Sequence, residues 1–259
     1  MALVQTDDRG AVRHVVLNRP EKRNAFNDEL VLALGEALRA AAADASVHCV
    51  VIRAHGPMFS SGMDLGSLNA LADDPGTLRP FRREIIEVWN LPEEMAKPTI
   101  CAIHGACIGG ALELALACDL RVSAADAVMG LPETRIGLIP DVGGSSRLPA
   151  VVGLGRAKEL ILTGRMIDGT EAERIGLVNR VAPAEELDAA VDGLAGELLA
   201  CAPLAVGLAK RVMDTSAKPA LSATLELEVA MQDLCARSED FAEGARAFAE
   251  RRQPEFSGR

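Results

Sequence analysis

The chain has 259 residues, enough to bury a substantial core without disulfides, and its 49% hydrophobic and 25% charged residues are typical of a globular protein. A formal net charge of −10 disfavours nucleic acids and anionic membrane surfaces as partners. The six cysteines form no CxxC pair and no signal peptide or membrane span is recognisable, so we expect a cytoplasmic protein with reduced thiols.

Strand and helix patterns alternate along the chain as far as Leu131, which predicts an α/β fold. Two alternating runs on either side of a turn at 7–10 predict a β-hairpin. Asn27 is a favourable N-cap for a helix that begins at Asp28. The further expected strands are 48–53, 99–103, 120–123 and 128–131, and the further expected helices are 78–95 and 109–118.

Beyond about Pro183 the chain becomes helical throughout. Apolar residues at helical spacing, such as Leu221, Leu225 and Val229, leave a stripe that the core or a neighbouring subunit could cover. This tail looks like a separate module. Its expected helices are 185–199, 203–214, 221–237 and 238–251.

Glu113 stands out because it is the single polar side chain in an expected helix of apolar residues and glycine. A helix that is apolar on all sides is buried, and a glutamate is almost never fully buried without a partner. Glu113 could reach solvent at an edge or pair with Arg121. It could also be a carboxyl that faces a catalytic cavity.

Glu133 follows Pro132 and precedes a glycine-rich turn, where an exposed glutamate would be ordinary. Together with Glu113 it suggests a pair of carboxyls whose pKa values differ, which would supply an acid and a base. Gly109 and Gly110 precede the helix that carries Glu113. The first amides of a helix lack internal partners and can hold an oxyanion, and the loop 59–64 could supply a second amide.

Other kinds of site find little support in the sequence. The histidines have no metal-ligand spacing, and no GxSxG, P-loop or GxGxxG pattern opens a strand-to-helix turn. We therefore expect no metal and no nucleotide cofactor.

Several segments together resemble the enoyl-CoA hydratase/isomerase (crotonase) superfamily. Each motif alone is unspecific, but the combination is specific and covers essentially the whole chain. The matching segments are 17–20, 24–26, 59–65, 104–114, 131–133, 137–140, 143–144 and the tail 241–259.

The resemblance implies a spiral core of repeated ββα units over 1–195, which carries the acyl-CoA and catalytic site. A helical C-terminal region over 196–259 would form a homotrimer or a dimer of trimers. The substrate would be an acyl-CoA thioester, with no cofactor beyond the CoA of the substrate itself. Non-catalytic and RNA-binding relatives exist on this fold, but the two glutamates and the negative charge speak against both.

Residue roles follow from the positions that match the family motifs. The amides of Met63 and Gly110 would hold the thioester oxygen, and Glu113 and Glu133 match the two hydratase glutamates. The substrate-binding residues implied by the resemblance are Ala25, Ser61, Gly62, Met63, Asp64, Leu65, Gly66 and Gly110.

The implied activity is hydration of a trans-2-enoyl-CoA to a 3-hydroxyacyl-CoA. Asp141 departs from the hydratase pattern, in which glycine follows the proline. Dienoyl-CoA isomerases carry an aspartate there, although they usually have aspartate in place of Glu113. Asp141 could cap a turn, or it could be a third catalytic carboxyl of a dienoyl-CoA or enoyl-CoA isomerase.

Overall fold

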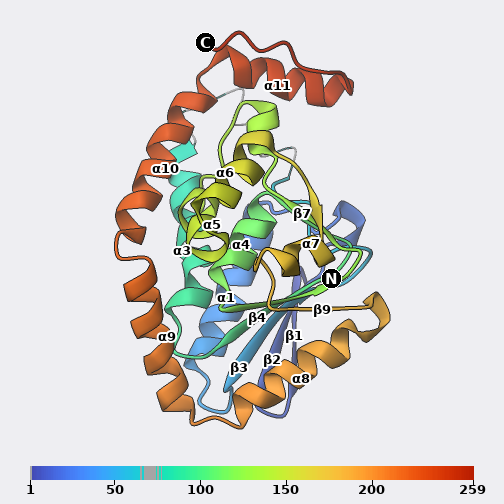
Figure 1. The fold of residues 1–259 in the computed structure, drawn as a ribbon, viewed down its shortest axis with the longest axis vertical. Coiled ribbons are helices and arrows are strands. Elements are labelled where there is room, and N and C mark those ends of the chain that lie inside the picture. Colours follow the sequence, from blue (N-terminus) through green and yellow to red (C-terminus); the bar gives the residue numbers. More distant parts are fainter. Residues whose placement is uncertain (1, 65, 67–73, 75, 77) are drawn as a thin grey trace.

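The computed structural model describes residues 2–64, 66, 74, 76 and 78–259, without the side chain of Phe81 (Figure 1). Leu65, which we expected at the CoA site, lies outside the described residues. The α/β fold expected from the sequence is confirmed.

The larger sheet has six strands in the order β1-β2-β3-β4-β6-β9. β1 and β2 form the expected antiparallel hairpin, and the other neighbours are parallel. The turn is tighter than expected, because β1 continues through Arg9 and pairs it with Val12. The bounds are β1 Val4–Arg9, β2 Val12–Leu17, β3 Cys49–Ala54, β4 Thr99–Ile103, β6 Leu120–Ala124 and β9 Arg180–Ala182.

A smaller sheet contains β5 (Ala106–Ile108), β7 (Val128–Gly130) and β8 (Ile167–Asp168). β5 and β7 are parallel, and β8 is antiparallel to β7. A bridge between Ser60 and Cys107 attaches the glycine-bearing loop 55–64 to β5. This sheet therefore brings that loop next to the start of helix α4, which directly follows β5.

The helices match the expected ones closely where apolar spacing was clear. The Asn27 side chain accepts a hydrogen bond from the Leu30 N–H at 3.2 Å, which confirms the predicted N-cap. The segment 144–174 contains helices that we did not expect. The bounds are α1 Asp28–Ala43, α3 Leu78–Glu94, α4 Gly110–Ala117, α5 Gly144–Val152, α6 Leu154–Thr163, α7 Gly169–Arg174, α8 Leu187–Leu199, α9 Pro203–Ala217, α10 Leu221–Ala236 and α11 Glu239–Glu250, with 3-10 turns η1 Pro20–Lys22, η3 Glu133–Ile136 and η4 Ala184–Glu186.

Helices α9 and α10 run along one edge of the molecule, and α11 crosses its end (Figure 1). α10 packs against α3 and α5, while α11 packs against η3, the turn that begins at Glu133. A small apolar cluster that includes Leu138 and Phe241 secures this contact. The expected boundary after residue 195 falls inside α8, and the division of the chain into two units stays a prediction.

The main core is aliphatic, as the scarcity of aromatic residues predicts. Its largest side chain is Trp89, whose ring meets that of Phe26 edge to face at 4.9 Å. All six cysteines are free thiols, and four of them are buried. Among the described residues no single helix is long and apolar enough to cross a membrane, whereas Ala184–Leu199 and Pro203–Ala217, bent by 103°, pass that test only as a pair.

Candidate active site

Helix α4 is buried along its whole length, and the Glu113 side chain is buried with it, at 2% exposure. Glu113 Oε1 accepts hydrogen bonds from the N–H groups of Val142, at 3.0 Å, and Gly144, at 2.8 Å. Arg121 instead donates to backbone carbonyls of Ala115, Cys118 and Leu177. Both ordinary alternatives for Glu113, a solvent-exposed edge and a pair with Arg121, are therefore wrong.

The loop that holds Glu113 depends on close packing at Gly144, the first residue of α5. A Cβ atom at this position would lie 2.8 Å from Glu113 Oε1 and 2.6 Å from Pro140 Cβ. Only glycine leaves room for the carboxyl to reach the two backbone donors. The other carboxyl oxygen, Oε2, is then the one that remains for chemistry.

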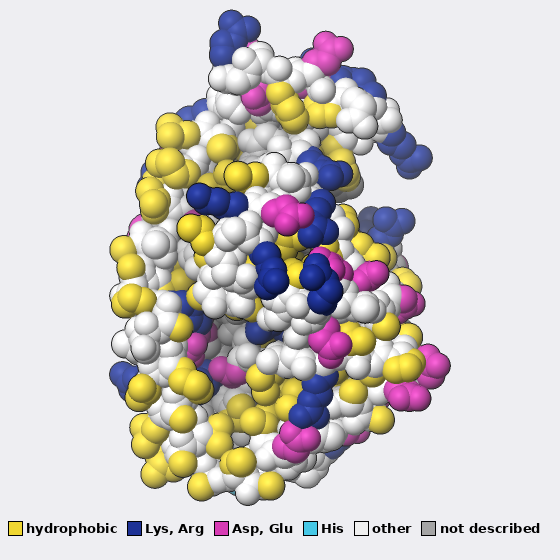
Figure 2. All heavy atoms as spheres, viewed as in Figure 1, with side chains coloured by type: hydrophobic (Ala, Val, Ile, Leu, Met, Phe, Trp, Pro, Cys, Tyr) yellow, Lys and Arg dark blue, Asp and Glu magenta, His cyan; other side chains and the backbone are white. Residues whose placement is uncertain are grey.

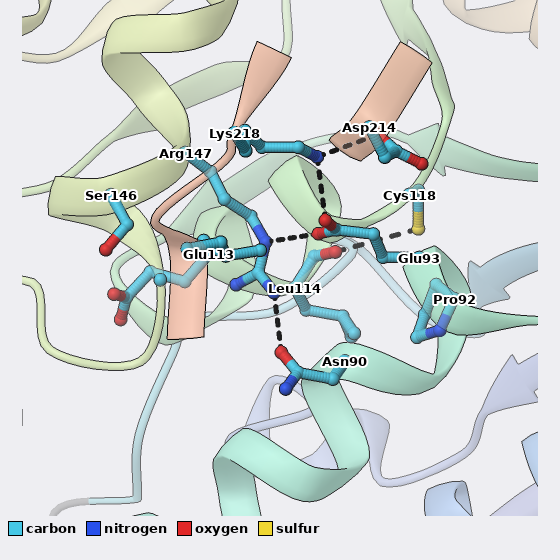
Figure 3. A network of polar contacts seen from close by, with 12 residues as sticks. Asn90, Pro92, Glu93, Glu113, Leu114, Cys118, Ser146, Arg147, Asp214 and Lys218 are labelled. Carbon is cyan, nitrogen blue, oxygen red and sulfur yellow. Dashed lines mark hydrogen bonds and ion pairs between the residues drawn. The ribbon is translucent and has the colours of Figure 1, made fainter. Parts of the chain in front are cut away.

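Side chains from distant parts of the sequence hold the segment that carries the Val142 and Gly144 N–H groups in place. Glu228 of α10 accepts hydrogen bonds from the Gly143 N–H, at 2.8 Å, and from the Ser146 hydroxyl. Figure 3 shows a second network, in which Arg147 of α5 pairs with Glu93 of α3 at 2.8 Å and Lys218 pairs with the same carboxylate at 2.9 Å. The Glu113 carboxyl points away from that second network.

Glu133 opens the turn η3, and its carboxyl lies directly against Gly109. The Gly109 backbone has φ +57°, and a Cβ there would lie 2.7 Å from Glu133 Oε1. Glu133 Oε2 is buried and has no hydrogen-bond partner within the part of the chain that the structure describes. Burial raises the pKa of Glu133 to about 8.

Asp141 is a buried member of the same group and not a solvated turn residue. It is 3% exposed and forms an ion pair with Arg82 of α3. Burial raises the pKa of Asp141, and the Arg82 charge opposes that shift. Burial, together with the neighbouring Glu133, Asp141 and Glu228 carboxyls, raises the pKa of Glu113 far above its usual value.

Met63 and Gly110, whose backbone amides the sequence singled out, line the same cavity as these carboxyls. Gly110 is the first residue of α4, so its N–H has no acceptor within the helix. The Gly62 carbonyl and the Asp64 N–H both pair with Phe26, and alternate groups of an extended chain point to opposite sides. The Met63 N–H is therefore directed away from Phe26. A Cβ at Gly110 would lie 3.2 Å from Met63 Sδ, which places the two residues side by side.

A cavity of about 410 Å³ joins these elements. Ser61, Gly62, Met63, Gly110, Glu113, Glu133 and Asp141 all line it, as we expected of one site. Ala25, Asp64 and Gly66 are not in its wall: Ala25 is buried, Asp64 pairs with Arg19 at 2.7 Å, and Gly66 is exposed. Gly109, which the sequence singled out, also lines the cavity. The other lining residues were not expected at the site: Arg82, Ile108, Pro132, Arg135, Ile136, Leu138, Val142, Gln232, Phe241, Gly244, Ala245, Ala247, Phe248, Arg252, Gln253 and Pro254.

The sequence of α10 contained a pattern from which its buried polar residues could have been predicted. Glu228 and Gln232 lie on the same face as Leu225 and Val229, and all four are buried. A polar residue within a buried apolar stripe is the observation that singled out Glu113. The same argument, applied to this stripe, would have assigned Glu228 and Gln232 to the interior.

The chain is similar to known proteins along nearly its whole length. The family model for enoyl-CoA hydratase/isomerase matches residues 7–259. The chain is 38% identical over 245 residues to a probable mitochondrial enoyl-CoA hydratase 2 of Arabidopsis thaliana, covering 94% of this chain and 81% of the relative. It is 35% identical over 255 residues to a crotonyl-CoA hydratase of Syntrophomonas wolfei, covering 98% and 96%.

The fold is also shared with a solved structure. An enoyl-CoA hydratase from Mycobacterium avium subsp. paratuberculosis superimposes with a TM-score of 0.88 at 30% identity, covering 99% of both chains. Similarity over this length, in both sequence and fold, confirms the superfamily that the sequence motifs indicated. The chain belongs to the enoyl-CoA hydratase/isomerase family.

Proposed function

We propose that the protein is an enoyl-CoA hydratase, which adds water to a trans-2-enoyl-CoA and forms a 3-hydroxyacyl-CoA. The observation that carries this proposal is the meeting of two buried carboxyls, Glu113 and Glu133, with two backbone amides in one cavity. Hydration needs a base for water at Cβ, an acid for Cα and donors for the thioester oxygen. The cavity contains candidates for all three.

The carboxyls have different surroundings and therefore different roles. In Glu113, the N–H groups of Val142 and Gly144 donate to Oε1 and favour the ionised carboxylate against the effect of burial. Its Oε2 then takes a proton from water as the water oxygen bonds to Cβ. The Glu133 proton passes to Cα. The amides of Met63 and Gly110 stabilise the negative charge that develops on the thioester oxygen. Return of one proton from Glu113 to Glu133, through solvent, restores the starting state.

The CoA portion of the substrate needs a path that leads away from the carboxyls. We assign the pantetheine and adenine to the loop 61–66 together with Ala25, by the position of these residues in the family motif. The reaction requires no cofactor beyond this CoA, because the acid, the base and the oxyanion donors all belong to the chain. A cytoplasmic location is part of the same proposal.

The alternative is a dienoyl-CoA or enoyl-CoA isomerase that uses Glu113, Glu133 and Asp141. The observation in its favour is the burial of Asp141 in the same cavity wall, where it could accept a proton from the far end of a conjugated acyl chain. The ion pair with Arg82 favours the hydratase, because it holds the Asp141 carboxylate against a guanidinium and opposes the rise of its pKa that burial causes.

An assay of wild type and Asp141→Asn on crotonyl-CoA and on a 3,5-dienoyl-CoA separates the two activities. Asparagine keeps an acceptor for Arg82 but cannot exchange a proton. We expect rapid hydration of crotonyl-CoA by both proteins, with rates within a few-fold of each other. Negligible hydration by the wild type, together with dienoyl isomerisation that the substitution abolishes, would replace the hydratase by the isomerase.

We further propose a homotrimer or a dimer of trimers. Large apolar side chains are exposed along α9 and α10, on the edge of the molecule where hydrophobic atoms gather in Figure 2. Such a stripe is unfavourable in contact with water and favours association. The exposed residues are Leu204, Leu208, Val212, Met213, Leu227, Met231 and Leu234.

Light scattering at micromolar concentration tests this assembly. We expect a mass of three or six chains, because three copies can bury their apolar stripes around one axis. A stable monomer would contradict the proposal.

A further inference from the structure

Gln232 of α10 is fully buried, at 0% exposure, and lies in the cavity wall. Its Oε1 accepts a hydrogen bond from the Ile139 N–H at 2.9 Å. Because the backbone group can only donate, this contact determines which end of the amide is oxygen. The NH₂ group is therefore the free end of the side chain.

That NH₂ group has no acceptor among the residues that the structure describes. A buried donor without an acceptor is costly, and such groups in native proteins usually have a function or bind a ligand. Gln232 lines the cavity that contains Glu113 and Glu133. A ligand in this cavity can supply the missing acceptor.

The wall of this cavity holds other polar groups. The buried ion pair of Arg82 and Asp141 lies in the wall of the cavity that Glu113 and Glu133 also line. The unbranched alkyl chain of a simple enoyl-CoA would leave the Gln232 NH₂ group without an acceptor. The polar lining therefore suits an acyl group with a polar atom of its own.

We propose that the preferred substrate is an enoyl-CoA whose acyl chain carries a neutral oxygen, a hydroxyl or a carbonyl, beyond the double bond, and that this oxygen accepts a hydrogen bond from Gln232 Nε2. This inference rests on the proposed hydratase function. The Gln232 NH₂ group is a hydrogen-bond donor, so it selects an acceptor and does not pair with a cationic group. A carboxylate is disfavoured, because Glu113, Glu133 and Asp141 already crowd the cavity with acids.

The test compares trans-2-hexenoyl-CoA with its derivatives that carry a hydroxyl at carbon 4, 5 or 6, and with an analogue that ends in a carboxylate. For the wild type we expect kcat/KM for at least one hydroxylated compound to exceed that of the parent by about tenfold, the effect of one hydrogen bond to a buried amide. In Gln232→Leu this preference should disappear, while hydration of the parent continues.

The ratio of kcat/KM between the hydroxylated and parent compounds separates loss of hydroxyl recognition from disturbance of the backbone at Ile139. Loss of the acceptor for the Ile139 N–H slows hydration of all compounds alike, whereas loss of recognition affects the hydroxylated one alone. Equal kcat/KM for the parent and all hydroxylated compounds in the wild type would overturn the inference even if the variant does not fold. Preference for the carboxylate would overturn it as well. Hydration of none of the compounds would instead reject the hydratase itself.

Discussion

Replacing Glu113 by glutamine is expected to lower kcat for hydration of crotonyl-CoA by about 10²–10⁴-fold, the usual contribution of a positioned acid or base. The glutamine oxygen can still accept from the Val142 and Gly144 N–H groups, so the loop keeps its donors paired. The NH₂ group, however, replaces the oxygen that takes a proton from water. Steady-state kinetics should show the loss in kcat with little change in KM.

Thermal unfolding of the same variant provides the control for folding. We expect a Tm equal to or above that of the wild type, because a neutral amide is less costly to bury than a carboxyl that can ionise. The exposed Glu185→Gln is a matched substitution that should leave both kcat and Tm unchanged. Near-normal turnover of Glu113→Gln on every enoyl-CoA tested would reject Glu113 as the base.

Gly144→Ala should lower kcat by about 10²-fold, although position 144 contributes no side chain to the reaction. The new Cβ would overlap Glu113 Oε1 and Pro140, at 2.8 and 2.6 Å, so the carboxyl must move away from its two donors. A displacement of about 1 Å at a reacting group can reduce the rate by this factor. The measurement is kcat for crotonyl-CoA, with KM as the check on binding.

Gly155→Ala offers the matched control for that substitution. Both glycines lie in the first turn of a helix, but a Cβ at Gly155 would have no heavy atom within 4 Å. We expect full activity and unchanged or slightly higher stability, since alanine is the better helix former. Equal kinetics for the two variants would show that the loop can move without disturbing Glu113.

The parts of the fold that the sequence predicted are those with strong local patterns. The hairpin, the strand 99–103 and the helix after Gly109 follow from alternation, apolar runs and glycine, and all are present. Helices α5 and α6 were missed, because α5 contains Pro149 and neither helix has a side-chain N-cap to mark its start. Short helices of this kind depend on packing more than on their own sequence.

The residues of the candidate site likewise include some that local sequence could predict and some that it could not. Glu113 could be recognised because it is the only carboxyl in an otherwise apolar helix. The amides of Met63 and Gly110 were predicted from their positions in the family motifs. The pairing of Asp141 with Arg82 joins residues 59 positions apart, and that of Gly143 with Glu228 joins residues 85 positions apart. No local pattern reports such contacts, because they exist only after the helices have packed.

The contribution of α10 and α11 to the cavity has a consequence for biosynthesis. A ribosome makes the chain from its N-terminus, and the sheet and α4 can begin to fold while later residues are still unmade. Gln232, Phe241, Phe248 and Pro254 nevertheless form part of the cavity wall. A nascent chain that has already placed Glu113 in its helix therefore has no closed acyl pocket. Catalytic competence arrives only with the final segment, so chains interrupted late in translation should be inert.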